Sequence, residues 1–360
     1  MAKAEYIWAI GDIHGYTSSL SALLNRINEF NTKRIVFLGD YIDRGPEPKE
    51  VIDIIIDQKV DKVALLGNHE LMLLNSISEG KSNTKSVFVW SENGYETTLR
   101  SFEAGDVTSL EKTLEGKYLE FFKSLSLFHV ETFSSGKKSI NILFSHAGPF
   151  VNNPITEQLD IKNYESFLKY ISEKKIDPEN TCLTNTDSLL QDNIQSWAGY
   201  FMVHGHMRTQ YRHDTNRLQY GDNKSEFNDE LSDIPSPLYV PNKNIVTSLG
   251  IDTGIDIGGK LTAVGFSKEN IDFGSGKMKI KVIQAESERR NKNVPTLVFD
   301  LTISFSDDYN FVNKLMKSIF TSDKKKSEVK DKPHQSGNGH HAAQSKHGSG
   351  HKTPQVKKKH

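Results

Sequence analysis

The chain has 360 residues, of which 36% are hydrophobic and 25% are charged, and its formal net charge at pH 7 is −1. This composition is typical of a globular protein that is long enough to bury a sizeable core. The sequence has no apolar run of about 18 residues and only one cysteine, Cys182, so we expect no membrane-spanning helix, disulfide framework or cysteine-rich zinc site.

Five apolar runs are predicted to be β-strands, and a polar side chain that can bind a metal follows each of them closely. Helical patterns at 20–27, 49–58 and 69–77 follow the first three runs. This alternation of strand and helix predicts an α/β protein with a parallel-rich sheet. The runs and their polar residues are 6–10 with Asp12 and His14, 34–38 with Asp40, 60–66 with Asn68, 140–144 with His146, and 200–203 with His206.

The second half of the chain has a different pattern. Strands are predicted at 244–251, 260–266, 277–284 and 297–305, and because no helix separates them we expect antiparallel pairing. A closing helix is predicted at 307–320. Residues 80–135 and 152–195 are interpreted as helical or loop insertions between core strands, and 215–243 as an irregular loop.

Charge is distributed unevenly along the chain. Residues 323–360 contain 10 Lys against 3 Asp or Glu, whereas residues 1–322 carry a net charge of −8. The C-terminal segment has almost no large apolar residue, so we expect a disordered Lys- and His-rich tail. It could solubilise the protein or bind an acidic partner or an anionic surface. The acidic body makes nucleic acid an unfavourable substrate.

The polar residues after the five strands have the composition of a metal site. Ligands gather at the carboxyl ends of strands in open α/β sheets, so these side chains are expected at one edge. Oxygen and nitrogen donors suit Mn, Fe, Zn or a similar ion. Six donors are too many for one ion with open positions, and they fit two divalent ions that share a carboxylate. Two ions roughly 3.5–4 Å apart can hold a hydroxide between them for in-line attack on phosphorus.

Three further side chains fit chemistry on a phosphate ester. Arg44 offers a guanidinium fork that matches phosphate oxygens. His69 offers an imidazole that can protonate the leaving group, and Asp43 could orient and charge that ring. These residues are our candidate catalytic groups, and Arg44, Asn68 and His69 are also candidate substrate-binding residues.

The motifs around these residues resemble the signature blocks of the phosphoprotein phosphatase family of calcineurin-like metallophosphoesterases, in particular bacterial serine/threonine-protein phosphatases. The match is ordered and covers roughly residues 6–266. Segments 90–94 and 98–99 also resemble bacterial members. The blocks are Gly11-Asp12-Ile13-His14-Gly15, Gly39-Asp40-Tyr41-Ile42-Asp43-Arg44-Gly45, Gly67-Asn68-His69-Glu70, Ser145-His146-Ala147-Gly148, Gly205-His206, Ile251-Asp252-Thr253-Gly254 and Gly258-Gly259-Lys260-Leu261-Thr262.

The resemblance implies an α/β (α+β) fold for the catalytic domain at residues 1–322, with a central β-sandwich flanked by helices and a dinuclear site at the sheet edge. The antiparallel C-terminal strands would then form the second sheet. Arg44 would bind phosphate, and His69 with Asp43 would form an acid dyad. One ion would be held by Asp12, His14 and Asp40, and the other by Asp40, Asn68, His146 and His206.

One departure from the family concerns phosphate binding. Members usually carry a second phosphate-binding arginine between the last two ligand blocks, and the comparable stretch here, 188–193, has none. Arg208, Arg212 or Arg100 could substitute, and Arg208 is our candidate because it follows His206 closely. We interpret Trp90 and Trp197 as packing residues rather than as platforms for substrate stacking.

The predicted function is hydrolysis of phosphomonoesters with two divalent ions, for which Mn is the first choice. The expected substrates are phosphoproteins carrying phosphoserine or phosphothreonine, with phosphotyrosine as a further option. A nucleotide hydrolase resembling symmetrical diadenosine tetraphosphatases is the alternative, and a phosphate-binding protein without activity is a third hypothesis. The N-terminus lacks the apolar core of a signal peptide, so the cytoplasm is the default location. Export by a route without a cleavable signal would leave no mark in the sequence.

Overall fold

The computed structural model describes residues 4–78, 84–150, 153–176, 183, 199–209, 217–218, 238–239, 248–290 and 293–305. These residues all belong to one compact unit, 1–313. The predicted closing helix, the tail at 323–360, most of 177–198 and most of 215–243 lie outside the described residues, and so do Cys182, Trp197 and Arg212.

The first sheet is built around β1 (Glu5–Ile10), which lies parallel to β2 (Asn31–Phe37) and antiparallel to β10 (Lys260–Phe266). The strand order is β11-β12-β10-β1-β2-β3, and β13 also pairs with β12. The other members are β3 (Asp61–Ala64), β11 (Ile271–Asp272), β12 (Lys277–Glu286) and β13 (Thr296–Ser304).

This topology corrects the expectation that the antiparallel C-terminal strands form the second sheet. Three of the four predicted strands, β10, β12 and β13, complete the first sheet instead, with Ile7 opposite Phe266 and Ile10 opposite Ala263. The fourth, predicted at 244–251, does lie in the second sheet, at Ser248–Gly250, but it pairs in parallel with Tyr200–His204. The physical reason lies in β1, which is buried along nearly its whole length and needs a hydrogen-bonding partner on both edges. The first sheet is therefore mixed, with parallel pairing on one side of β1 and antiparallel pairing on the other.

The second sheet has the order β4-β5-β6-β9-β8-β7. Strand β4 falls inside the stretch 80–135 that was interpreted as an insertion, so that boundary was wrong and the helical insertion ends before Phe128. A tight turn at Gly136, which has a φ of 60°, joins β4 to β5 as a hairpin. The strands are β4 (Phe128–Ser135), β5 (Lys138–Ser145), β6 (Tyr200–His204), β7 (Arg217–Leu218), β8 (Leu238–Tyr239) and β9 (Ser248–Gly250).

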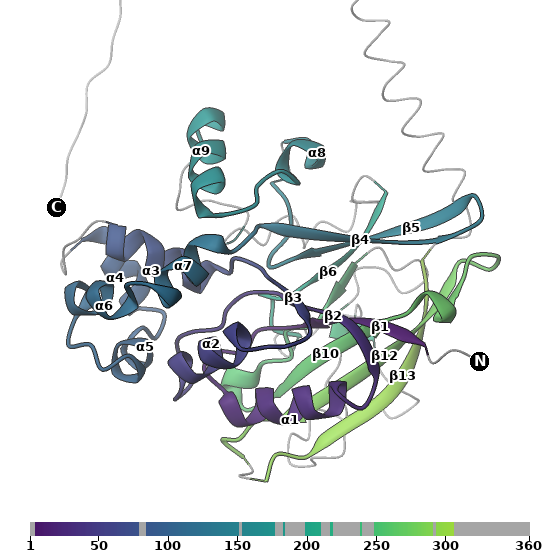
Figure 1. The fold of residues 1–360 in the computed structure, drawn as a ribbon, viewed down its shortest axis with the longest axis horizontal. Coiled ribbons are helices and arrows are strands. Elements are labelled where there is room, and N and C mark those ends of the chain that lie inside the picture. Colours follow the sequence, from purple (N-terminus) through teal and green to yellow (C-terminus); the bar gives the residue numbers. More distant parts are fainter. Residues whose placement is uncertain are drawn as a thin grey trace, which may run out of the picture. The chain divides into compact units, whose positions relative to one another are not determined.

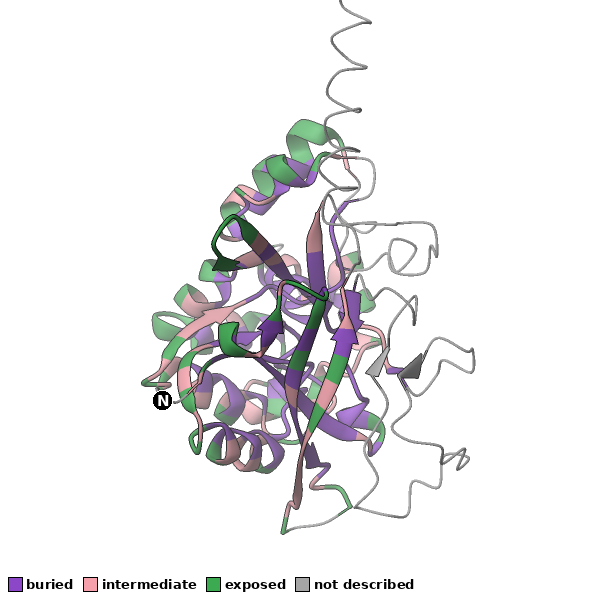
Figure 2. Cartoon of the chain, turned by 90° about the vertical axis from the view of Figure 1, so that its right-hand side faces the viewer, coloured by how far each residue is buried: buried purple, intermediate pink, exposed green. Residues whose placement is uncertain are grey.

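The two sheets enclose an apolar core, and the alternation of side chains along β1 shows how. Ile7 and Ala9 join the cluster that includes residues of β5, β6 and β9, whereas Trp8 and Ile10 join the cluster that includes the helices. Successive side chains of a strand point to opposite faces, so β1 contributes to two cores at once. Figure 2 shows the buried residues running along the strands and along the inner sides of the helices.

Helices cover the outer faces of this sandwich (Figure 1). Helix α1 places Leu20, Leu23, Leu24 and Ile27 on one buried face and packs on β10 and β12. Helix α2 begins at Pro48, a residue that favours the first turn of a helix. Among the described residues, no helix is both long and apolar enough to cross a membrane. The helices are α1 (Thr17–Ile27), α2 (Pro48–Ile56), α3 (Asn68–Ser78), α4 (Lys85–Ser91), α5 (Glu96–Ser101), α6 (Val107–Leu114), α7 (Lys117–Ser124), α8 (Ile155–Gln158), α9 (Tyr164–Lys174) and the short 3-10 turns η2 (Ile255–Ile257) and η3 (Lys268–Asn270).

Candidate metal and phosphate site

The loops that leave the carboxyl ends of the strands have an unusual backbone. Left-handed backbone is costly for residues with a Cβ, and it persists where the surrounding structure enforces it, often at functional sites. Seven non-glycine residues of the described chain have positive φ, and five of them are predicted site residues. Those five are His14, Asp40, Asp43, Arg44 and His206.

The histidines among the predicted ligands are held as neutral rings with one lone pair facing inward. His146 donates from Nδ1 to the carbonyl of Leu38 at 3.0 Å, and His14 donates from Nδ1 to the carbonyl of Ile42 at 2.9 Å. A carbonyl can only accept, so Nδ1 carries the proton and Nε2 is left with its lone pair. Burial, followed by the charge of Arg44, lowers the pKa of His14 to about 3, and burial also lowers the pKa of His146. Both rings are therefore neutral at neutral pH, and Nε2 of His14 accepts from Arg44 Nη1 at 2.7 Å, a hydrogen bond that a metal ion bound at this nitrogen would replace.

Several of these acceptor atoms converge on one point. His146 Nε2 lies 3.0 Å from Asn68 Oδ1 and 3.4 Å from Asp40 Oδ1. His206 Nδ1 lies 2.9 Å from the same Asn68 oxygen and 3.2 Å from His146 Nε2. Burial, followed by the neighbouring His146, lowers the pKa of His206 to about 3, so the ring is neutral at neutral pH and one of its nitrogens keeps a lone pair that a cation can use. A divalent cation fits such a cluster of carboxylate, amide and imidazole donors.

A second group of donors lies on the other side of Asp40. His14 Nε2 is 3.7 Å from Asp40 Oδ2, and one donor atom each of His14, Asp40 and His69 falls within a 4.8 Å cluster. Asp12 lies beside them, with both of its oxygens 3.1 Å from the backbone N–H of His206. Burial, then the carboxylates of Asp252 and Asp40, raise the pKa of Asp12 well above its usual range. The crowding of buried carboxylates on this side also fits a bound cation.

The predicted acid dyad is assembled in full. His69, at the start of α3, donates from Nδ1 to Asp43 Oδ2 at 2.6 Å, and both side chains are fully buried. Burial lowers the pKa of His69, but the charges of Asp40 and Asp43 outweigh it, and the pKa is raised overall. The other ring nitrogen, Nε2, is buried without a hydrogen-bond partner among the described residues, and it lies 3.8 Å from Asp40 Oδ2. When protonated, this nitrogen has a free N–H beside the predicted ligands. A general acid needs such a donor to protonate the leaving oxygen.

Two residues that sequence reasoning did not assign to the site hold Asp43. Trp90 is fully buried, as expected of a packing residue, but its indole N–H also donates to Asp43 Oδ2 at 2.7 Å. Thr98 donates its hydroxyl to Asp43 Oδ1 and accepts the backbone N–H of Asp43 at 3.0 Å. The only sequence signal was the resemblance of segments 90–94 and 98–99 to bacterial family members, which indicated no role for either residue.

A third unassigned residue, Glu70, shapes the loop that carries Asp40. Its carboxylate accepts four backbone N–H groups, at 2.9 Å from Asp40, 2.8 Å from Tyr41, 3.3 Å from Ile42 and 3.2 Å from Gly67. Burial, followed by the nearby charge of Asp40, raises the pKa of Glu70 to about 8. The available signal was an acidic residue in the first turn of α3, directly after His69.

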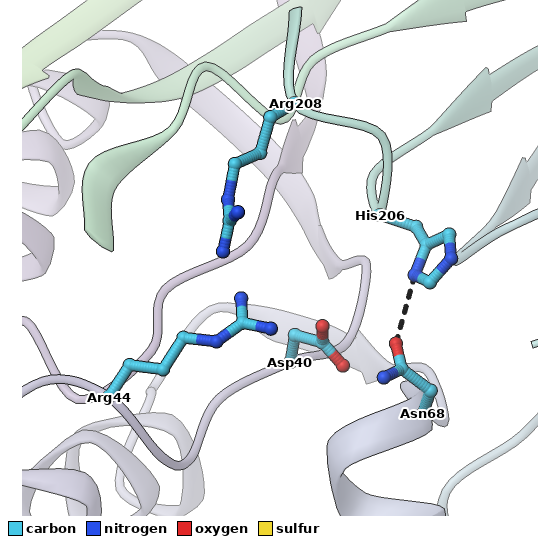
Figure 3. A pocket seen from close by; sticks show the side chains of 5 residues that line it. All are labelled: Asp40, Arg44, Asn68, His206 and Arg208. Carbon is cyan, nitrogen blue, oxygen red and sulfur yellow. Dashed lines mark hydrogen bonds between the residues drawn. The ribbon is translucent and has the colours of Figure 1, made fainter. Parts of the chain in front are cut away.

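A cavity of about 170 Å³ opens beside these groups and is lined by Asp40, Arg44, Asn68, His206 and Arg208. Figure 3 shows the guanidinium groups of Arg44 and Arg208 extending into the same space, opposite Asn68 and His206.

The two arginines share a carboxylate that the sequence reasoning did not identify. Arg208 donates from Nε to Asp256 Oδ1 at 3.0 Å and from Nη2 to Oδ2, and Arg44 Nη1 lies 3.2 Å from the same Oδ2. Asp256 thus fixes the two guanidinium groups side by side. Of the other proposed substitutes for the missing family arginine, Arg100 is exposed and does not line this cavity, and Arg212 and the stretch 188–193 lie outside the described residues.

Comparison with known proteins gives a consistent set of relatives. A model of the family described as calcineurin-like phosphoesterase matches residues 6–229. The asymmetrical bis(5'-nucleosyl)-tetraphosphatase PrpE of Oceanobacillus iheyensis is 29% identical over 153 residues, which cover 39% of this chain and 54% of that protein. Serine/threonine-protein phosphatase 2 of Escherichia coli K12 is 35% identical over 80 residues, which cover 22% of this chain and 36% of that protein.

A solved structure, the hypothetical protein PH1004 from Pyrococcus horikoshii OT3, aligns with a TM-score of 0.40 and 12% identity over 88% of this chain and 94% of its own. The alignments with the two curated relatives are shorter. This chain spans about half the length of the tetraphosphatase and about a third of the phosphatase.

Proposed function

Because the chain belongs to the calcineurin-like phosphoesterase family, we propose that it is a metal-dependent hydrolase of phosphomonoesters whose substrates are phosphoproteins. The observation that carries the proposal is a small cavity lined by two arginines and by three of the predicted metal ligands, Asp40, Asn68 and His206, with the orphaned Nε2 of His69 3.8 Å from Asp40 Oδ2. Each of these groups matches one need of phosphoester hydrolysis: charge neutralisation, metal binding and protonation of the leaving oxygen.

The residues divide into ligands and substrate-contacting groups. Asp12, His14 and Asp40 would hold one divalent ion, and Asp40, Asn68, His146 and His206 would hold the second. When bound, such ions lower the pKa of water and neutralise charge on a phosphoryl oxygen. The metal is left open, since Mn, Fe and Zn all accept these donors.

His69 is assigned to proton transfer rather than to metal binding. Its Nδ1 is engaged with Asp43, and the raised pKa favours the protonated ring. A protonated imidazole cannot ligate a metal, but it can donate from Nε2 to the leaving oxygen. Asp43 keeps the proton of Nδ1 in place, which turns Nε2 toward Asp40 Oδ2, 3.8 Å away.

Arg44 and Arg208 are the proposed phosphate-binding pair. Both line the cavity, and Asp256 holds both guanidinium groups from behind. Two planar donor groups side by side suit the non-bridging oxygens of a phosphoryl group. In this arrangement Arg208 takes the place of the arginine that family members usually carry between the last two ligand blocks.

A dinucleoside polyphosphatase is the second candidate, and the relatives supply its support. The match to the asymmetrical tetraphosphatase covers more of this chain than the match to the protein phosphatase. The cavity argues for the phosphomonoester instead, because pockets that enclose a whole drug-sized ligand measure about 300–1,000 Å³. At about 170 Å³, and with no Phe, Tyr or Trp among the described residues that line it, this cavity suits a phosphoryl group rather than a nucleoside.

The test is an activity profile of the protein loaded with Mn²⁺. Phosphoserine, phosphothreonine and phosphotyrosine peptides would be compared with diadenosine tetraphosphate, beside an Asp40→Asn variant that removes the shared carboxylate. Turnover of the peptides that is lost in the variant supports the proposal and ranks the phosphoresidues. Preferential cleavage of the dinucleotide selects the second candidate, and inertness toward every substrate overturns both.

A further inference from the structure

We infer that Trp90 and Thr98 are positioning residues, which hold the carboxylate of Asp43, and through it the ring of His69, in the orientation needed to protonate the leaving group. The inference rests on the proposed function. It gives helices α4 and α5, which belong to the insertion between the core strands, a direct part in the acid step.

The carboxylate of Asp43 is fixed at both oxygens. Oδ2 accepts from Trp90 Nε1 at 2.7 Å and from His69 Nδ1 at 2.6 Å, while Oδ1 accepts from the hydroxyl of Thr98. The Thr98 oxygen also accepts the backbone N–H of Asp43, so one threonine anchors the side chain and the main chain together. All four side chains are fully buried, so water cannot replace a donor that is removed.

The need for such support follows from the backbone of Asp43. Its φ of 69° places it in the left-handed region, outside any strand or helix. The direction of its side chain is therefore not set by the regular geometry of a secondary-structure element. A carboxylate can rotate about its terminal torsion, which is broad and roughly two-fold. Donors on both oxygens restrict that rotation, and the plane of the carboxylate in turn restricts the plane of the imidazole. Trp90 and Thr98 therefore act on His69 without touching it.

If Trp90 only filled space in the core, its replacement should affect the enzyme no more than replacement of Trp8, another buried tryptophan. Both tryptophans are fully buried, but Trp8 Nε1 has no hydrogen-bond partner among the described residues. Phenylalanine at either position removes the indole N–H and part of the ring. Only Trp90→Phe removes a donor to Asp43, so Trp8→Phe controls for the loss of buried aromatic volume.

The experiment compares two classes of ester with each variant. An activated aryl phosphate such as p-nitrophenyl phosphate expels a good leaving group and needs little help from an acid, whereas a phosphoserine peptide expels an alkoxide and needs the acid fully. Trp90→Phe and the nearly isosteric Thr98→Val should lower kcat on the peptide by about 10- to 100-fold, because each removes a buried hydrogen bond to a charged group. Turnover of the aryl phosphate and KM for both esters should change far less, and Trp8→Phe should leave the ratio of the two rates unchanged.

A readout independent of turnover accompanies the kinetics. In a proton–nitrogen NMR spectrum of the protein without added metal, the indole resonance of Trp90, assigned by its loss in Trp90→Phe, should move when Asp43 is replaced by asparagine, while that of Trp8 should not. The inference is overturned if the wild-type protein hydrolyses both esters but Trp90→Phe and Thr98→Val lower the two rates by the same factor. It is also overturned if the chemical shift of the Trp90 indole does not change in Asp43→Asn. Wild-type protein that hydrolyses neither ester overturns the proposed function, and the positioning role with it.

Discussion

Adding one methyl group at Gly205 should disturb the site more than its size suggests. A Cβ built at this position would lie 2.1 Å from Asp12 Oδ1 and 3.3 Å from Asp12 Cγ. Real Cβ atoms essentially never come closer than 3.0 Å to a heavy atom outside their own and the adjacent residues, so the two groups must separate by at least 0.9 Å. Asp12 is buried and its oxygens accept the backbone N–H of His206, so little room exists for that movement.

The size of the effect follows from this clash. Overpacking a dense interior costs about 1–3 kcal/mol of folding free energy. Gly105→Ala is the matched control, since a Cβ there meets no atom within 4 Å and its φ is not positive. That substitution should stabilise the protein by about 0.4–1 kcal/mol through the unfolded chain. Relative to the wild type, Gly205→Ala should therefore lower the free energy of unfolding, and Gly105→Ala should raise it.

Urea unfolding would measure stability, and calorimetric titration with Mn²⁺ would measure metal binding. Gly205→Ala should weaken binding about 10- to 100-fold, as displacement of groups that orient metal ligands commonly does. Gly105→Ala should bind like the wild type. If Gly205→Ala retains both the stability and the metal affinity of the wild type, then Asp12 does not lie against Gly205 as described, and its assignment as a ligand loses support.

Three further expectations concern charge and metal. Arg208→Ala should raise KM for a phosphopeptide by about 10-fold with a smaller change in kcat, because one charged hydrogen-bond donor to phosphate is lost; steady-state kinetics beside Arg100→Ala would measure it. Burial raises the pKa of Glu131, but hydrogen bonds from His129 and Arg34 outweigh it and hold the pKa below its ordinary value of 4.5. This lowered pKa contributes stability above pH 4.5 that is lost as pH falls through the folded value, so Glu131→Gln should unfold with a flatter acid dependence than the wild type. Mn²⁺ at about 100 times its Kd should stabilise the fold by about 2.7 kcal/mol, which thermal unfolding with and without a chelator would detect.

Each of these expectations has an outcome that contradicts it. An unchanged KM in Arg208→Ala would remove Arg208 from the phosphate-binding pair. Parallel acid-unfolding curves for Glu131→Gln and wild type would mean that the ion pairs of Glu131 do not form in solution. A melting temperature that changes with neither Mn²⁺ nor chelator would argue against a preformed metal site.

The parts of the site that could be predicted from sequence are those with a local signal. Asp40, Asn68, His146 and His206 each follow an apolar run within one to three residues, and the carboxyl ends of strands meet at one edge. The structure places these four side chains around one point for that reason. Their assignment as ligands, together with that of Asp12 and His14, stays a prediction.

The parts that could not be predicted depend on contacts between distant segments. The pairing of β1 with β10 places Ile10 opposite Ala263, far away in the sequence, and no local pattern of apolar residues specifies it. A tryptophan in the sequence is usually a packing residue of the core. Only the structure shows that the indole N–H of Trp90 lies beside Asp43 and donates to it. Asp256 follows the recognised motif at 251–254 but had no role until its carboxylate was located between two arginines.

The position of β10 has a consequence for the chain as it leaves the ribosome. Strand β1 is made first, yet one of its neighbours, β10, ends at Phe266, which is 256 residues after the end of β1 at Ile10. At a synthesis rate of about 5–20 residues per second, the nascent strand waits roughly 10–50 s for that partner. An apolar strand with an open edge is a template for aggregation during that time. Recruitment of a chaperone to the first strand would protect the nascent chain until translation has passed β10.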